Sequence, residues 1–201
     1  MKDQKLESYI MEELPGRLAP ALHDELWRKG YQEREGKDAQ NWKPLKDPEG
    51  DMAYLASLGQ EEVDRRAERN IYKKEDNGDW KVNINNDFDV LTPSWQEENK
   101  QAAKEATELV GRVRNGENLS LKEVGHILHE KWLSRNEWAK DDKVLGLPFQ
   151  ELPEVEKEKD LAQYRLALAV SAKLEEEYKM GPAAPVEVKE KKAAVSSGPR
   201  P

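Results

Sequence analysis

Apolar residues recur every three to four positions over most of this chain, which is the spacing of amphipathic helices. Near the start, Leu6, Tyr9, Ile10 and Leu14 follow it. The whole pattern predicts helices over residues 1–15, 17–35, 51–70, 92–113, from Ser120 onward and 153–180. A mainly α fold is therefore expected.

Residues with special backbone preferences mark the helix ends. Pro15-Gly16 predicts a break between the first two helices. Ser120 followed by Glu123 forms a capping box, and Gly181 predicts the end of the last helix. The intervening segments are rich in Gly, Pro and Asp and are predicted to be loops.

One segment, residues 70–84, has the pattern of a β-hairpin. Aromatic and β-branched residues flank Asn77-Gly78, the pair best suited to the positive φ angles of a tight turn. The next residues, NNDFDV, resemble a calcium loop in their acids and amides. They lack the Gly at the sixth position and the Glu at the twelfth, so a polar loop is predicted.

Two short motifs occur twice along the chain. Leu22-His23-Asp24 corresponds to Leu128-His129-Glu130, and each is followed by a tryptophan, Trp27 or Trp132. The residues LTPSWQEEN (91–99) correspond to LPEVEKEKD (152–160), which pairs Asn99 with Asp160. The stretch between the motifs is much longer in the first copy, so the first unit is expected to hold an insertion.

These motifs resemble the Ryr repeat domain, a family named for the ryanodine receptor and also found in bacterial and phage proteins. Its pattern begins with an apolar residue, His-Glu and a Trp on a first helix. It closes with ELPE, a short charged run and an Asn or Asp on a second helix. The matching stretches here are LHEKW (128–132) with PFQELPEVEKEKD (148–160), and LHDELW (22–27) with LTPSWQEENKQAA (91–103). The second unit lacks the family's glycine-aromatic segment, and ELP has become LTP in the first.

The repeat and the resemblance together predict the domain organisation. The first helical unit is expected over residues 1–115, with an insertion at about 43–89 that carries the hairpin. The second Ryr-like unit is expected over 116–180. Residues 181–201 are rich in Pro, Ala and Lys, and we expect a disordered tail.

Composition narrows the function classes. The net charge of −8 disfavours non-specific binding to nucleic acids or anionic membranes. The absence of cysteine excludes thiolate catalysis and cysteine-based metal sites. No apolar run reaches the roughly 18 residues that span a bilayer, and the N-terminus is unlike a signal peptide. We therefore expect a cytosolic protein, in a bacterium or an infected host cell.

The histidines and tryptophans are the candidate site residues. A histidine at each helix seam is expected to bond Asn99, Asp160 or a backbone carbonyl, with a tryptophan packed beside it. If a cleft opens there, the same residues line it and Asn or Asp selects a ligand's polar edge. The predicted ligand-binding residues are His23, Trp27, Trp42, Trp80, Asn99, His129, Trp132 and Asp160. His126 and His129 lack a third ligand in sequence, so no metal site is expected.

The resemblance implies a non-enzymatic binding module of bacterial or phage origin. Ryr-like modules of bacteria have been suggested to bind small polar ligands, among them nucleotides. For a viral member, this suggested role implies sequestration of an immune signalling nucleotide. The alternative is a structural or protein-interaction component, such as a phage assembly or virion protein, which predicts a homo-oligomer or a protein partner. No cofactor and no catalytic residue are expected.

Overall fold

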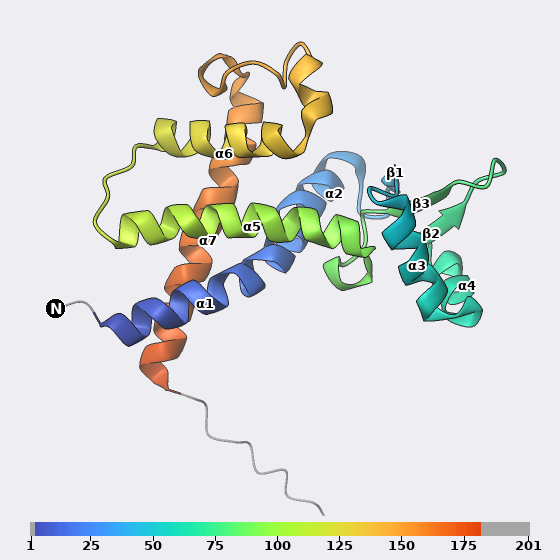
Figure 1. Cartoon of the computed structure of the whole chain (residues 1–201), viewed down its shortest axis with the longest axis horizontal. Coiled ribbons are helices and arrows are strands. Elements are labelled where there is room, and N and C mark those ends of the chain that lie inside the picture. Colours follow the sequence, from blue (N-terminus) through green and yellow to red (C-terminus); the bar gives the residue numbers. More distant parts are fainter. Residues whose placement is uncertain (1–2, 182–201) are drawn as a thin grey trace, which may run out of the picture.

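The fold is mainly α, with one small antiparallel sheet, in the computed structural model that describes residues 3–181 (Figure 1). In chain order the elements are α1 (Gln4–Ala21), the π-helix η1 (Leu22–Arg28), α2 (Lys29–Glu35), β1 (Trp42–Pro44), α3 (Pro48–Leu58), α4 (Gln60–Glu68), β2 (Tyr72–Lys74), β3 (Trp80–Asn83), the 3₁₀ turn η2 (Phe88–Val90), α5 (Pro93–Arg114), α6 (Leu121–Arg135), the 3₁₀ turns η3 (Glu137–Asp141) and η4 (Phe149–Glu151), and α7 (Glu154–Met180). The predicted mainly α class is confirmed. The predicted disordered tail, apart from Gly181, lies outside the described residues.

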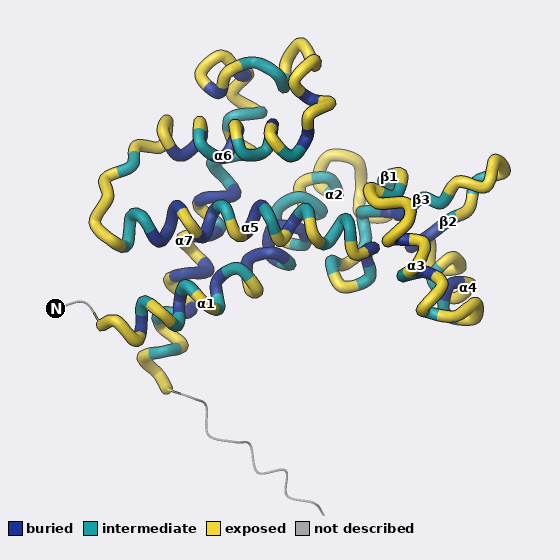
Figure 2. The backbone as a smooth tube through the Cα atoms, in the orientation of Figure 1, coloured by how far each residue is buried: buried dark blue, intermediate teal, exposed yellow. Residues whose placement is uncertain are grey.

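The main core lies where α7 crosses α1, α5 and α6 (Figure 1). Leucine, isoleucine and valine side chains fill it, and small residues such as Ala103, Ala106 and Ala167 are completely buried between the helices. Small side chains at a crossing let the helix backbones approach closely. Figure 2 shows this buried zone along α1, α5 and α7. The core draws on both predicted helical units, since Val124 and Leu128 of α6 belong to it.

Helix α1 continues through Pro15, so the predicted break at Pro15-Gly16 is wrong. A proline inside a helix removes one backbone hydrogen bond and costs about 3 kcal/mol. Burial of an unbroken apolar stripe with a spacing of four offsets that cost. The stripe consists of Leu6, Ile10, Leu14, Leu18 and Leu22. Tertiary packing therefore overrides the local signal.

The segment between α2 and α5 has its own small core. Strands β1, β3 and β2 form an antiparallel sheet in that order, and Gly78 takes a φ of 93° in the hairpin turn. The predicted hairpin is confirmed, and β1 joins it as a third strand. The buried side chains of this second core are Leu55, Val63, Ile71, Tyr72, Val82 and Leu91.

The helix predicted over residues 51–70 is two helices, α3 and α4. They meet at Gly59, whose φ of 79° lies in the left-handed region that favours glycine. The Gly59 N–H bonds the Ala56 carbonyl at 3.3 Å and ends α3. The apolar stripe of this segment alone did not reveal the turn.

A buried aspartate joins the insertion to the main helices. Asp51 of α3 is 1 % exposed, and its carboxylate accepts hydrogen bonds at the start of α5. The donors are the Thr92 hydroxyl (3.1 Å), the Ser94 backbone N–H (3.1 Å) and the Ser94 hydroxyl. Asp51 therefore caps α5 from another helix, at the end where the helix dipole favours a negative charge.

We expect Asp51→Ala to lower the free energy of unfolding by about 2 kcal/mol, because buried donors lose their acceptor. Urea denaturation followed by circular dichroism measures the change. The matched control is Asp47→Ala, which removes an exposed cap with a single bond to the Gly50 N–H and should cost about 1 kcal/mol or less. Equal losses in the two variants would contradict this role of Asp51.

Candidate functional site

A cleft of about 570 Å³ lies between the two histidine helices and the helices that follow them. Its walls come from η1, α2, the first turns of α5, the end of α6 and the first turns of α7. The volume falls in the range of small-molecule sites, roughly 300–1,000 Å³. Of the predicted site residues, His23, Trp27, Asn99 and Trp132 line this cleft.

A second cavity, of about 270 Å³, adjoins the cleft. His129 and Asp160, two further predicted residues, line it together with Leu145, Leu152 and Glu156. The side chains that line both cavities are Trp27, Trp132, Lys159 and Gln163. We call the larger space the main cleft and the smaller one the side chamber.

Trp42 and Trp80 line neither cavity; the structure does not bring them to the other predicted residues. Trp42 lies in β1, where Lys73 Nζ stands 4.8 Å from the centre of its ring. Trp80 packs against the second core from β3. Both serve the sheet of the insertion, because hairpin strands recruit aromatic side chains for cross-strand packing.

The two buried histidines, on η1 and α6, make the same kind of contact. His23 Nε2 lies 2.9 Å from the Asn86 carbonyl oxygen, and His129 Nε2 lies 2.9 Å from the Leu147 carbonyl oxygen. Each carbonyl stands two residues before the phenylalanine that opens a 3₁₀ turn, η2 or η4. A carbonyl oxygen only accepts, so Nε2 carries the proton in both rings. The predicted bond from each seam histidine to a backbone carbonyl is present.

The helix type differs between the two histidine segments. Four positions separate His23 from Trp27, and three separate His129 from Trp132. The first pair lies in the π-helix η1, and the second lies in the regular helix α6. A π-helix takes more residues per turn than an α-helix. The wider turn accommodates the extra residue, and both tryptophans reach the main cleft.

Cations surround the aromatic walls of the main cleft. The lining arginines and lysine are Arg28, Arg34, Arg135 and Lys159, and the lining acids are Glu98 and Glu158. Arg28 is paired with Asp87 and, at 3.4 Å, with Asp24. Within residues 3–181, Arg34 forms its one ion pair with the adjacent, exposed Glu35, and its guanidinium lies 5.6 Å from the centre of the Tyr31 ring. Its side chain is 65 % exposed, so it is accessible to a ligand.

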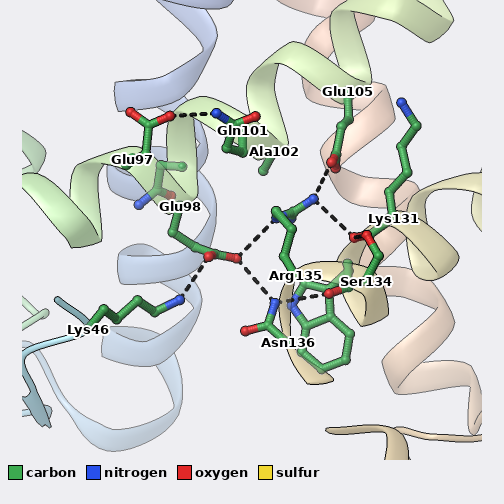
Figure 3. A network of polar contacts seen from close by, with 12 residues as sticks. Lys46, Glu97, Glu98, Gln101, Ala102, Glu105, Lys131, Ser134, Arg135 and Asn136 are labelled. Carbon is green, nitrogen blue, oxygen red and sulfur yellow. Dashed lines mark hydrogen bonds and ion pairs between the residues drawn. The ribbon is translucent and has the colours of Figure 1, made fainter. Parts of the chain in front are cut away.

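Glu98 links the main cleft to two other parts of the chain, as Figure 3 shows. Its carboxylate accepts from Lys46 Nζ at 2.8 Å and from Asn136 Nδ2 at 3.3 Å, and lies 3.6 Å from Arg135 Nε. Burial opposes its ionisation, but the bond and charge of Lys46 and the charge of Arg135 outweigh it and lower its pKa. A negative Glu98 therefore holds Arg135 at the cleft wall.

Burial shifts the pKa values of three groups in or beside the two cavities. Burial lowers the pKa of His23, against the bond to the Asn86 carbonyl and the charge of Asp24. Burial also raises the pKa of Asp24, against the charge of Arg28. The largest shift is at Asp160, whose pKa is raised to about 7 by burial and the charge of Glu156, with Lys159 opposing. The side chamber therefore contains a carboxyl that titrates near neutrality.

Sequence reasoning missed part of the cleft. Trp95 lines it and donates from its indole Nε1 to the Pro44 carbonyl at 3.1 Å. Arg135 lies three residues after Trp132, so helical spacing could have placed it on the same face. Tyr31 and Arg34 line the cleft because α2 continues directly from the π-helix η1. The sequence pattern did not predict this π-helix.

Residues 3–181 contain no group of three or more His, Asp or Glu side chains that could hold a metal ion. His126 is exposed and His129 is buried, so the pair does not converge despite its spacing of three.

No helix among residues 3–181 is long and apolar enough to cross a membrane.

Trp138 differs from the other tryptophans, because it is 65 % exposed. Its ring meets the Trp132 ring edge-on, with 6.0 Å between centres, outside the two cavities. An exposed tryptophan suits a protein contact. The alternative function, a protein-interaction component, stays a prediction.

The comparisons give no relative. No protein-family model, curated protein or solved structure matches this chain. The Ryr resemblance therefore stays a prediction, and the function rests on the geometry of the cleft.

Proposed function

We propose that the chain is a non-enzymatic binding module whose main cleft holds a small, flat, anionic ligand of the nucleotide type. One observation carries the proposal: tryptophans and cationic side chains from separate helices line a single cavity of about 570 Å³. The aromatic members are Trp27, Tyr31, Trp95 and Trp132. Indole faces stack on nucleobases with little regard to base identity.

The cations suit the phosphates of such a ligand. Arginine presents a planar fork of donors that matches phosphate oxygens, and lysine supplies a point charge. Arg34 and Lys159 are exposed residues at the cleft, so a phosphate can reach them with a modest loss of hydration. The chain as a whole carries a net charge of −8, which limits the attraction of long nucleic acids.

The Ryr resemblance supports the same function. The residues that carry it in each unit, a histidine and a tryptophan on one helix and Asn99 or Asp160 on the next, line the two adjoining cavities. We propose that the two units are diverged copies of a Ryr-like module and that the ligand binds where they meet. A cytosol, bacterial or of an infected host, is the compartment that fits a soluble nucleotide ligand.

Calorimetric titration tests the proposal. The panel consists of mononucleotides, cyclic dinucleotides and ADP-ribose derivatives, with the matching nucleosides as controls for the phosphate. We expect saturable binding of at least one nucleotide, weaker binding of its nucleoside, and an affinity that falls as salt is raised, because the phosphate contacts are ionic. Flat titrations across the panel would contradict the proposed function.

A further inference from the structure

The side chamber is smaller than the main cleft. Its volume of about 270 Å³ lies just below the range of about 300–1,000 Å³ for whole small-molecule sites, so it suits one part of a ligand. It lies beside the main cleft, because Trp27 and Trp132 line both spaces. One ring system therefore fits in the chamber while the rest of the ligand stays in the main cleft.

Asp160 presents acceptor oxygens to this chamber. Its side chain is 16 % exposed, and its one recorded polar contact within residues 3–181 is to His129 Nδ1, 3.5 Å from Oδ2. The nearby Gln163 cannot satisfy it with the same hydrogen, since its Nε2 donates to the Ala102 carbonyl at 2.9 Å. A mostly buried carboxyl with so little hydrogen bonding is costly unless something else donates to it.

The histidine beside Asp160 is not a donor to it in the neutral state. His129 Nε2 donates to the Leu147 carbonyl, so the neutral ring turns a lone pair on Nδ1 toward Asp160. Two acceptors then face each other across 3.5 Å. A proton on Asp160, or a ligand donor placed against it, relieves the arrangement.

We propose that the side chamber binds a guanine base, with Asp160 accepting from its N1–H and its 2-amino group. This inference rests on the proposed function. Guanine is the common base that offers two adjacent donors on its pairing edge, and a carboxylate accepts two parallel bonds. Adenine presents an acceptor at N1, and uracil flanks its single donor with carbonyls. Trp27 and Trp132 supply the apolar walls of the chamber.

The proposed contact between guanine and Asp160 makes the affinity for guanine depend on pH. Only ionised Asp160 accepts both donors, and its pKa in the ligand-free protein is raised to about 7. The affinity for guanine is therefore fully developed above that value and falls about tenfold per pH unit below it. The charged and titratable groups that face Asp160 are His129 from α6 and Glu156 and Lys159 from its own helix, α7.

The test compares GMP, IMP and AMP by calorimetric titration above pH 7. IMP lacks the 2-amino group, and AMP replaces the N1 donor with an acceptor. We expect GMP to bind about 10- to 100-fold more tightly than the other two, the range for one bidentate contact. Asp160→Asn should abolish that preference. The matched control, Glu154→Gln, removes the same charge from an exposed residue of α7 that lines neither cavity, and should keep it.

Each outcome decides a separate point. Equal binding of the three nucleotides overturns the guanine assignment and leaves the proposed function standing. No binding of any nucleotide overturns both. If choline binds in a manner that depends on Asp160 and GMP shows no preference, the chamber is an ammonium cage and the guanine assignment is wrong. If Asp160→Asn fails to fold, the wild-type GMP-to-IMP affinity ratio still decides, because it must fall as the pH drops below about 7.

Discussion

Trp132→Ala weakens nucleotide binding by about 5- to 150-fold, the equivalent of about 1–3 kcal/mol for one base stacked on an aromatic ring. Trp132 lines both the main cleft and the side chamber, so its loss removes an aromatic wall from each space. Its ring also stacks near the His129 ring, with 6.1 Å between centres. Equilibrium titration, followed by calorimetry, measures the effect against the tightest nucleotide of the panel.

Trp138→Ala is the matched control. Trp138 contacts Trp132 but lines neither cavity and is largely exposed. We expect less than a threefold change in nucleotide affinity, as for a surface substitution outside the site. If the two alanine variants lose affinity equally, or if Trp132→Ala binds normally, the ligand does not lie in the main cleft.

Gly125→Ala lowers the free energy of unfolding by about 2–3 kcal/mol, because it overpacks a closed contact. A Cβ at this position would lie 2.1 Å from Cζ of Phe149, which is 4 % exposed. The ring of Phe149 must move, and with it the turn η4 that leads into α7. The Leu147 carbonyl that holds His129 lies two residues earlier, so we also expect weaker ligand binding.

Gly16→Ala provides the control for helix propensity. Gly16 lies in α1, is exposed, and has nothing within 4 Å of a built Cβ. There alanine should raise stability by about 0.5–1 kcal/mol, the usual gain over glycine in a helix. Urea denaturation of both variants gives the comparison. A gain of stability in Gly125→Ala as well would show that Phe149 does not close on α6.

Local signals in the sequence predicted much of the fold. The Ser120–Glu123 capping box is present at the start of α6, and Gly181 ends α7 as expected. Asn77-Gly78 marks a real hairpin turn, because its backbone geometry is local. These features depend on residues a few positions apart, which a sequence displays directly.

Features that depend on distant contacts were missed. The proline at position 15 does not break α1, since burial of Leu14 and Leu18 in the main core holds the helix together. The LHDELW motif did not predict the wide turn of η1, although His23 and Trp27 are one residue further apart than His129 and Trp132. A one-residue offset between repeats is thus a usable sign of a π-helix.

In the candidate site too, some residues were predicted from sequence motifs and others depend on tertiary packing. The repeated histidine, tryptophan and Asn or Asp positions were found from sequence, and the structure gathers them around two adjoining cavities. Trp42 and Trp80 were also predicted as site residues, but both lie in strands of the sheet and line neither cavity. Trp95 and Arg34 reach the cleft only through tertiary packing.

A crystal structure of the protein with its tightest-binding nucleotide tests the central claim most directly. We predict density for a base against Trp27 and Trp132, with phosphates near Arg34 and Lys159, in the space now seen as the main cleft and side chamber. A nucleotide bound on another surface, with the cleft filled only by solvent, would contradict the account.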